Sequence, residues 1–266
     1  MPRAARPLMG GPRAAAPAGA PTPGAPEKAA VRSMFDRIAP RYDLLNRLLS
    51  AGTDVRWRRK AVDYLERTGE GRILDLCAGT ADLLIEALGR DERLRGLGAD
   101  LSPQMLLRGL RKLERRGMAR RAALACGDGE RLPLRDAIFD GALVAFGIRN
   151  IGDPGTALRE LRRVLRPGGR LVVLEFALPR GPLGALYRFY FGRILPRIGG
   201  LISGAPEAYS YLPASVAAFP SPEAFGALMA EAGFEAVEWK ALTGGIAYLH
   251  RGDRPRSHRG DDVGGR

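Results

Sequence analysis

Residues 73–82, with the sequence ILDLCAGTAD, read as a buried strand that runs into a glycine turn and ends on an acid. Turns of this kind often hold nucleotides, and the dinucleotide fingerprint is G-x-G-x-x-G, whose second glycine lets the backbone approach a pyrophosphate. The turn here has a single glycine, Gly79. We expect Asp82 in the first helical turn, where it suits the helix dipole and points its negative charge into the pocket. The pattern therefore favours a ligand with a cationic centre and no phosphate.

Acidic residues also follow the next two strand-like segments. Asp100 ends the second segment, where a carboxylate can accept hydrogen bonds from both ribose hydroxyls, although NAD enzymes share this device. Asp128 follows the third segment and is placed to reach an adenine amino group. Each acid alone could be a solvated loop carboxylate, but jointly they favour S-adenosyl-L-methionine, which carries a sulfonium and an adenosine. The residues expected to bind this cofactor are Asp75, Gly79, Thr80, Asp82, Asp100, Asp128 and Gly129.

Strand and helix patterns alternate along the middle of the chain. Two helices are expected at residues 28–49 and 54–67, a later helix begins at Ser102-Pro103, and the last two strands form a closing pair. The alternation predicts an α/β, Rossmann-like fold with a seven-stranded, mostly parallel sheet, helices on both faces and an N-terminal helical lid over its carboxyl edge. The apolar face of the first helical segment is expected to hold Ile38, Leu44, Leu45, Leu48 and Leu49.

The bulk composition indicates one domain with unusual charge. The 266 residues are 45% apolar and carry a formal net charge of +13, mainly from arginine. This excess is typical of proteins that meet nucleic acid, anionic membranes or acidic ligands, and it can equally reflect genome composition. We expect residues 1–27, rich in Ala, Pro and Arg, to be a disordered leader, and residues 252–266 a disordered tail. Residues 28–251 form the single domain, with the lid at 28–67.

Cysteine and histidine are too sparse for a metal centre. Cys77 and Cys126 each sit in an apolar strand-like run and are expected to be small buried thiols in a reducing compartment. The two histidines, His250 and His258, lie near the C-terminus. No metal site is therefore expected. No stretch approaches the roughly 20 uninterrupted apolar residues that a membrane-spanning helix needs.

Several longer motifs resemble those of the ubiquinone/menaquinone biosynthesis C-methyltransferases, which are class I methyltransferases. They run in family order over about residues 31–251 and include YDLLN, DLCAGTAD, ADLSPQML, FGIRNIGD, RVLRPGGRLVVLEF, LPRIGGLISG and YSYLPASV. FGIRN together with YDLLN is specific for this family. The chain departs from the family's G-G-T-G-D turn at Ala78 and Ala81, and Ala81 fits only if its φ angle stays negative. Asp54 stands where the family often has histidine, and Ala145 where it commonly has a small polar residue.

The resemblance implies a reaction and a set of residues. It implies C-methylation of a polyprenyl quinol, converting demethylmenaquinol to menaquinol, with the methoxy-polyprenyl-benzoquinol of ubiquinone biosynthesis or another small aromatic or lipid metabolite as alternatives. Arg149 and Asn150 are the implied catalytic residues, although Arg149 could instead be a structural ion-pair partner. Trp57 is expected in the core, and Glu175 could contact substrate or make a structural hydrogen bond. Other implied contacts are Ala145 for the cofactor and Tyr42, Asp43 and Asn46 for the lid and substrate.

A polyprenyl substrate implies contact with a membrane. Residues 183–202 mix aromatic, aliphatic and basic side chains, as expected for a segment at the lipid interface or for a cover over the active site. We therefore expect a cytoplasmic protein at the inner face of the cell membrane. A nucleic-acid partner is not expected, because base methyltransferases usually carry an Asn/Asp-Pro-Pro-aromatic turn where this chain has FGIRN. A homodimer is compatible with the sequence, and a non-catalytic cofactor-binding protein is a further alternative.

Overall fold

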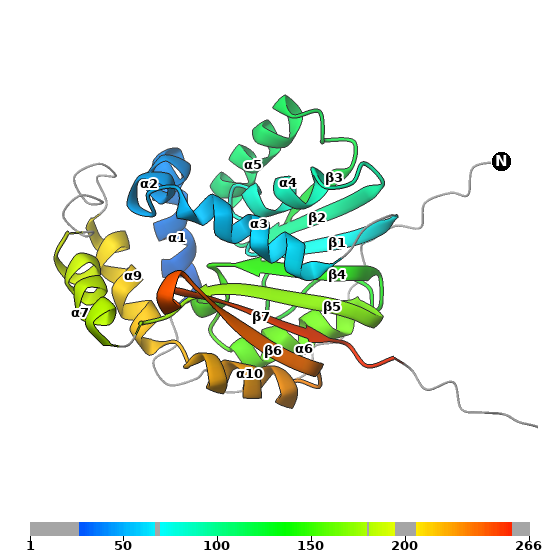
Figure 1. Cartoon of the computed structure of the whole chain (residues 1–266). Coiled ribbons are helices and arrows are strands. Elements are labelled where there is room, and N and C mark those ends of the chain that lie inside the picture. Colours follow the sequence, from blue (N-terminus) through cyan, green and yellow to red (C-terminus); the bar gives the residue numbers. More distant parts are fainter. Residues whose placement is uncertain (1–26, 67–69, 180, 195–205, 257–266) are drawn as a thin grey trace, which may run out of the picture.

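The computed structural model describes residues 27–66, 70–179, 181–194 and 206–256. In this part of the chain seven strands form one sheet in the order β3-β2-β1-β4-β5-β7-β6, and only β7 runs antiparallel to its neighbours (Figure 1). The expected seven-stranded, mostly parallel sheet is thus confirmed. The strands are β1 (Gly71–Leu76), β2 (Leu94–Asp100), β3 (Ala122–Cys126), β4 (Phe139–Ala145), β5 (Leu165–Phe176), β6 (Glu235–Leu242) and β7 (Ala247–Asp253).

Helices cover both faces of the sheet, as the strand pattern requires. Alternate residues of a strand face opposite sides, so Leu74 packs under one helix layer while its neighbour Ile73 packs under the other. One layer holds α3 (Thr53–Leu65), α4 (Asp82–Leu88) and α5 (Pro103–Arg115), and the other holds α6 (Pro154–Val164) and α10 (Pro222–Glu231). The expected cap of α5 is present, because the Ser102 Oγ accepts a hydrogen bond from the Met105 amide at 3.2 Å.

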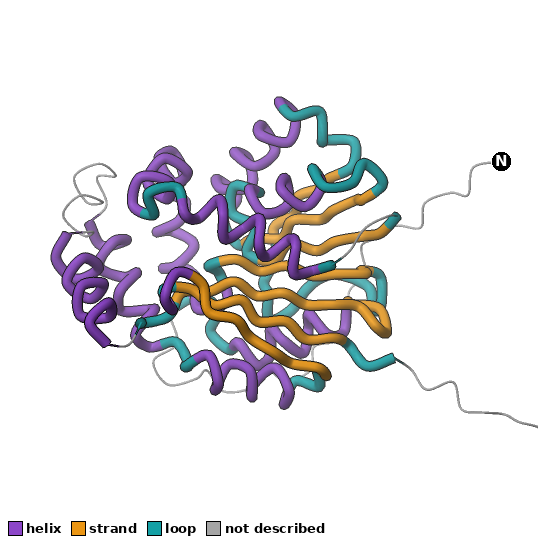
Figure 2. Tube along the Cα trace, in the orientation of Figure 1, coloured by secondary structure: helices purple, strands orange, loops and turns teal. Residues whose placement is uncertain are grey.

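The remaining helices gather at the carboxyl edge of the parallel strands (Figure 2). They are α1 (Lys28–Ile38), α2 (Tyr42–Leu49), α7 (Gly181–Phe189) and α9 (Pro206–Ala218). Side chains from these helices and from α5 form a third, smaller apolar cluster that includes Met34, Leu45, Tyr187 and Val216. The cluster holds the cover against the sheet's edge.

The lid is shorter than the sequence predicted, and it is not one helix. A 3-10 turn that contains Pro40 separates α1 from α2, because proline lacks the amide that would continue the helix. The second expected lid helix, α3, buries Trp57 and Leu65 on the sheet and so belongs to a helix layer. Only α1 and α2 therefore form the lid, in place of residues 28–67.

Three expectations about burial were wrong. The break at Pro40 rotates α2 relative to α1, so only Ile38 and Leu45 of the expected apolar face are buried among the side chains described. Leu44 and Leu48 are 62% and 54% exposed, and the Leu49 side chain lies outside the described residues. Cys126 is exposed, because the edge strand β3 is covered less than the central strands.

The C-terminal part of the domain also differs from expectation. The α9 helix was not anticipated, because Pro213 lies inside it and interrupts the helical pattern. The domain does not end at residue 251, since β7 runs to Asp253 and pairs with β5 along its length. The Arg254 guanidinium then donates to the carbonyls of Arg162 and Arg163, each at 3.0 Å. The first residues of the expected tail therefore belong to the folded domain, as the end of β7 and the contacts of Arg254 show.

His250 makes the stability of the fold depend on pH. Burial lowers the pKa of His250 to about 4, and its Nε2 lies 2.9 Å from the Pro222 carbonyl oxygen. In the unfolded chain this histidine therefore takes up a proton near pH 6.5, whereas in the folded chain it does so only near pH 4. The free energy of unfolding is expected to fall by roughly 3 kcal/mol from this group as the pH drops through that window.

Urea unfolding at pH 7.5 and pH 5, compared with the His250→Gln variant, measures this contribution. The amide of the variant can still donate to the Pro222 carbonyl but does not titrate. The variant should lose less stability than the parent between the two pH values. Equal losses in the two proteins would show that His250 is not the responsible group.

Candidate functional site

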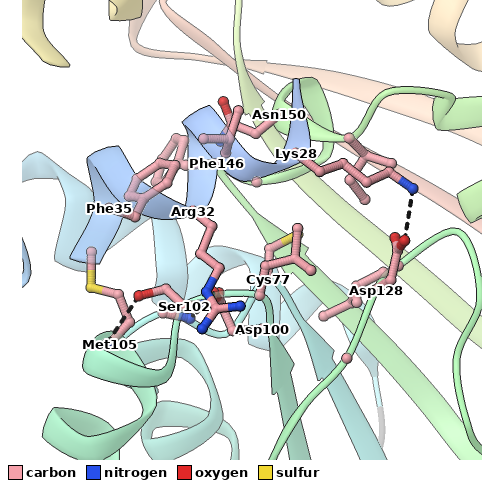
Figure 3. A pocket seen from close by; sticks show the side chains of 18 of the residues that line it. Lys28, Arg32, Phe35, Cys77, Asp100, Ser102, Met105, Asp128, Phe146 and Asn150 are labelled. Atoms are coloured by element: carbon pink, nitrogen blue, oxygen red, sulfur yellow. Dashed lines mark hydrogen bonds and ion pairs between the residues drawn. The ribbon is translucent and has the colours of Figure 1, made fainter. Parts of the chain in front are cut away.

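A cavity opens where β1 and β4 lie side by side and the strand order reverses, the place where open α/β sheets bind ligands. Its floor comes from residues after β1, β2, β3 and β4, and α1 lies across it (Figure 3). Of the residues predicted from the sequence, the cavity wall includes Tyr42, Gly79, Asp100, Asp128, Gly129, Ala145 and Asn150. Asp43, Asn46, Asp75, Thr80, Asp82 and Arg149 are not among the lining residues.

Asp100 joins the ends of the first two strands. Its Oδ2 accepts a hydrogen bond from the Gly79 amide and its Oδ1 one from the Ser102 amide, both at 2.8 Å. Burial raises the pKa of this carboxyl, and the two amides partly offset that rise. Each oxygen keeps a further lone pair, so Asp100 can still accept from hydroxyl groups in the cavity.

The glycine turn leaves empty space where a ligand can lie. Gly79 has φ +53°, and a Cβ atom placed on it would meet no atom within 4 Å. Ala81 has φ +63°, so the negative angle that the sequence analysis required is not observed. Its methyl group is fully buried and faces Gly109 of α5, where an added Cβ would come within 3.1 Å. Ala81 therefore does not narrow the cavity, and its buried methyl offsets part of the roughly 1–2 kcal/mol cost of the left-handed backbone.

Asp75 supports the turn from below rather than facing the cavity. It is 1% exposed, and its Oδ2 accepts a hydrogen bond from the Leu84 amide at 3.0 Å, which satisfies the first turn of α4. Burial raises the pKa of Asp75 to about 8, so the carboxyl carries a proton at neutral pH. Its contribution is to position the helix that follows the turn.

Asp82 does not point into the pocket, contrary to the sequence prediction. Its carboxylate forms an ion pair with Lys112 of α5 and a longer one, at 3.6 Å, with Arg58 of α3. Lys112 also pairs with Asp43 at 2.9 Å, and Thr80 donates its hydroxyl proton to the same Asp43 at 2.5 Å. Two cations outside the cavity thus attract Asp82 away from it, and the network ties α2 to the turn.

Sequence reasoning missed Lys112 and Arg58. One signal was available, because Asp54 and Arg58 have the i, i+4 spacing of a helical ion pair and lie 2.6 Å apart in the structure. Asp54 stands where the family often has histidine, and here it fixes Arg58 beside Asp82. Lys112 carried no such signal, since its partners come from other parts of the chain.

Polar contacts hold α1 over the cavity at both ends. Lys28 Nζ lies 2.7 Å from the carboxylate of Asp128, after β3 (Figure 3), and equally close to that of Glu130. Near the other end, Asp36 accepts a hydrogen bond from the Ser102 hydroxyl at 2.6 Å. The carboxylate that the sequence assigned to an adenine amino group thus has an ammonium as its partner in this structure. Lys28 and Asp36 were both missed, because their partners lie about a third of the chain away.

The FGIRN segment packs against the turn after β1. A Cβ on Gly147 would lie only 2.2 Å from the Cys77 Cβ, so no other residue fits there without a shift of the backbone. Phe146 stacks on Phe176 with ring centroids 4.3 Å apart. Trp57 lies 6.0 Å from the Phe146 ring, which confirms the expectation that Trp57 is a core aromatic. The close contact places the 3-10 turn Ile148–Asn150 (η2) at the cavity's edge.

Arg149 and Asn150 face different surroundings. The Arg149 Nη1 donates to the Glu175 carboxylate at 2.7 Å and to the Phe146 carbonyl at 2.6 Å. Glu175 is 1% exposed, and burial raises its pKa while Arg149 opposes that rise. Arg149 is thus the structural ion-pair partner that the sequence analysis gave as an alternative, and Glu175 makes the structural hydrogen bond given as its alternative. Asn150 is the residue of the pair that lines the cavity.

The lid supplies an aromatic wall to the cavity. Tyr42 and Phe35 both line it and meet edge to face, with ring centroids 6.2 Å apart. Burial raises the pKa of the Tyr42 hydroxyl, and a hydrogen bond with Asn46 offsets part of that rise. Asn46 therefore acts on the cavity through Tyr42. Among the residues described, no group of three or more His, Cys, Asp and Glu side chains could hold a metal ion.

The sheet order and this cleft together define a class I S-adenosylmethionine-dependent methyltransferase. A solved structure of such a methyltransferase from Thermotoga maritima has the same fold, with a TM-score of 0.59 and 23% identity over 84% of this chain and 99% of that one. The chain belongs to the ubiE/COQ5 methyltransferase family, whose model matches residues 24–254. Its methyl donor is S-adenosyl-L-methionine.

Relatives support the same family over nearly the whole domain. A protein of Thermus thermophilus named demethylmenaquinone methyltransferase is 54% identical over 84% of this chain and 100% of the relative. A protein of Syntrophotalea carbinolica named ubiquinone/menaquinone biosynthesis C-methyltransferase is 50% identical over 84% of this chain and 93% of the relative. The sequence-based family assignment is thereby confirmed.

The cleft fits the cofactor in two observed respects. The open space at Gly79 admits a ligand close to the backbone, and the buried Asp100 carboxylate offers acceptors beside it. Cys77, Phe146 and Ala145 add an apolar wall. The cofactor contacts assigned to individual residues remain predictions.

The variant Gly79→Ala tests the open space directly. Its Cβ would enter the cavity, so affinity for S-adenosylhomocysteine is expected to fall about 10-fold or more, measured by calorimetry. Gly117→Ala is the matched control, because Gly117 also has a left-handed φ of +68° and an open Cβ position. Both variants should lose a similar roughly 1 kcal/mol of stability. Equal cofactor affinity in the two variants would contradict the placement of the ligand at Gly79.

Proposed function

We propose that the chain converts demethylmenaquinol to menaquinol by C-methylation, in menaquinone biosynthesis. The observation that carries the proposal is the position of the FGIRN segment. Asn150 of that segment lines the same cavity as Gly79 and Asp100, so a ring held there would meet the cofactor. The name of the Thermus thermophilus relative supports the choice of a naphthoquinol ring.

The main contribution of the protein to this reaction is to align the ring carbon with the methyl group and the sulfur. When bound, S-adenosyl-L-methionine supplies a methyl group on a sulfonium that is already a good leaving group. A ring carbon is a weak nucleophile unless an adjacent hydroxyl is ionised or polarised, so the reduced quinol is the substrate. Correct orientation of the reacting atoms can contribute up to roughly 7–11 kcal/mol. The lid helices α1 and α2 exclude water from the cavity.

Asn150 and Arg149 have separate tasks in this proposal. Asn150 contacts the ring oxygen, which carries negative charge once its hydroxyl has ionised, and donation from the amide stabilises that charge. The charge activates the adjacent carbon and passes from the oxygen as this carbon bonds to the methyl group and the bond from methyl to sulfur breaks. The hydroxyl proton and the hydrogen displaced from the ring carbon both pass to water. Arg149 stays protonated and is held by Glu175, so it does not remove a proton but fixes the segment that carries Asn150. Tyr42 closes over the ring from the lid side, and Asp43 holds the lid to the turn.

A second substrate has one specific observation in its favour. The Syntrophotalea carbinolica relative bears a name that covers ubiquinone as well as menaquinone biosynthesis. The methoxy-polyprenyl-benzoquinol is therefore the second candidate. The two rings differ in size, and no lining residue described here distinguishes between them.

Incubation with methyl-labelled cofactor and each reduced quinone precursor separately tests the proposal. Mass analysis should find one added methyl group on the demethylmenaquinol ring and none on the oxidised quinone. Asn150→Ala should slow turnover about 100-fold, the scale for loss of one donor to a developing oxyanion. Label transfer to neither quinol would contradict the proposed function, and transfer only to the benzoquinol would favour the second candidate.

We propose that the lid end of the molecule contacts the inner face of the cell membrane. No helix in the described ranges is long and apolar enough to span a bilayer. Leu44 and Leu48 on α2 and Phe189 on α7 nevertheless project large apolar side chains into solvent, with Phe189 55% exposed. Arg47 is exposed on α2 and Arg193 on the turn Tyr190–Ile194 that follows α7, and the net charge of +13 favours anionic lipid. Residues 195–202 of the originally expected segment lie outside the described residues.

Cosedimentation with vesicles that contain anionic phospholipid tests this contact. The double variant Leu44→Ser/Leu48→Ser should lower the affinity for the vesicles about 100-fold or more, because each buried leucine contributes roughly 1.5–3 kcal/mol. Leu107→Ser/Leu110→Ser is the control, since these leucines are also exposed but lie on α5. Loss of binding in the control alone, or no binding by the parent at low salt, would contradict the proposal.

A further inference from the structure

The α9 helix contacts both residues of the Arg149–Asn150 pair, and the roles given above do not use it. Tyr211 and Ser215 are four residues apart and so lie on one face of α9. The Tyr211 hydroxyl donates to the Asn150 Oδ1 at 3.0 Å. The Arg149 Nε donates to the Ser215 Oγ at 3.3 Å, and Ser215 donates in turn to the Leu212 carbonyl at 3.0 Å. These contacts account for the YSYLPASV motif, within which both residues fall.

The Tyr211 contact decides which end of the Asn150 amide is available. Asn150 is 9% exposed and lies in the cavity wall, beside Phe146 in Figure 3. Its oxygen is occupied by the Tyr211 hydroxyl, so its NH₂ group, which has two donors, remains for a ligand. A flipped amide would turn its NH₂ toward the phenol oxygen, which is a weaker acceptor than an amide oxygen.

We propose that Tyr211 is a positioning residue that fixes Asn150 as a hydrogen-bond donor toward the acceptor ring. The inference rests on the proposed quinol methylation and adds a residue to it. The ionised ring oxygen that activates the attacking carbon is stabilised by a donor and repelled by the oxygen of a flipped amide. The orientation of the Asn150 amide is therefore set from α9, 61 residues further along the chain.

Arg149 and Ser215 make the arrangement rigid. The Arg149 guanidinium bonds to Glu175 and to the Phe146 carbonyl, so one side chain joins β5, η2 and α9. Val216, next to Ser215, is 3% exposed in the cluster beneath the lid. The α9 residues that bond to η2 therefore lie next to a residue of α9 that packs in the apolar cluster with α1 and α2.

The variant Tyr211→Phe removes the hydroxyl and keeps the ring. Turnover is expected to fall at least about 10-fold, with the KM for quinol changed less than kcat and the affinity for S-adenosylhomocysteine unchanged. Tyr64→Phe is the matched control, because the Tyr64 hydroxyl bonds to Glu238 on an outer strand, away from the cavity. The control should keep the parent's kcat.

Two further variants separate positioning from general loss of structure. If Tyr211 acts through Asn150, Tyr211→Phe/Asn150→Ala should be no slower than Asn150→Ala alone. Asn150→Asp should be as slow as Asn150→Ala, because a carboxylate accepts from Tyr211 but offers no donor to the ring. Multiplicative losses in the double variant, or substantial activity in Asn150→Asp, would overturn the proposal.

A readout without turnover keeps the inference separate from the proposed function. In ¹⁵N-labelled protein the side-chain NH₂ signals of Asn150 should shift or broaden in Tyr211→Phe and stay unchanged in Tyr64→Phe. Unchanged signals in both variants would overturn the role of Tyr211 whatever the substrate. A parent enzyme that methylates no quinol would overturn the proposed function, while these signals would still report on the Tyr211 contact.

Discussion

The close approach of Gly147 to Cys77 is the constraint on which the site depends. A side chain on Gly147 would overlap the Cys77 Cβ, so the segments after β1 and β4 can meet only because one of them has no Cβ. Their contact brings Gly79 and Asn150 to one cavity. The stacking of Phe146 on Phe176 then holds the segment after β4 against the end of β5.

The sequence predicted the sheet, the position of the cleft and the family, because these follow from local patterns. Strand–helix alternation, a one-glycine turn and acids at strand ends are all readable over a few residues. The burial of Leu44 and Leu48 and the direction of Asp82 were predicted wrongly. Each depends on elements that meet only in three dimensions: the break at Pro40 rotates α2, and Lys112 and Arg58 reach Asp82 from two other helices.

The same limit explains which functional residues were missed. Lys28, Lys112 and Tyr211 act through partners roughly 30 to 100 positions away, and no spacing rule within one helix or strand connects them. Arg149 is a different case. Its sequence motif indicated that the residue matters, but it did not indicate which groups the guanidinium contacts. In the structure its guanidinium joins Glu175, Phe146 and Ser215, so the motif marks the support of the site as much as its surface.

The two-ended fastening of α1 bears on the timing of catalysis. Lys28 with Asp128 and Glu130, and Asp36 with Ser102, are polar contacts that water can replace, whereas Met34 of the same helix lies in the apolar cluster that also holds Leu45 of α2. Opening of both polar contacts would uncover the part of the cavity that α1 covers. Substitutions at Lys28 or Asp36 are therefore expected to change how often α1 leaves the cavity, while the cluster around Met34 keeps the helix attached to the domain.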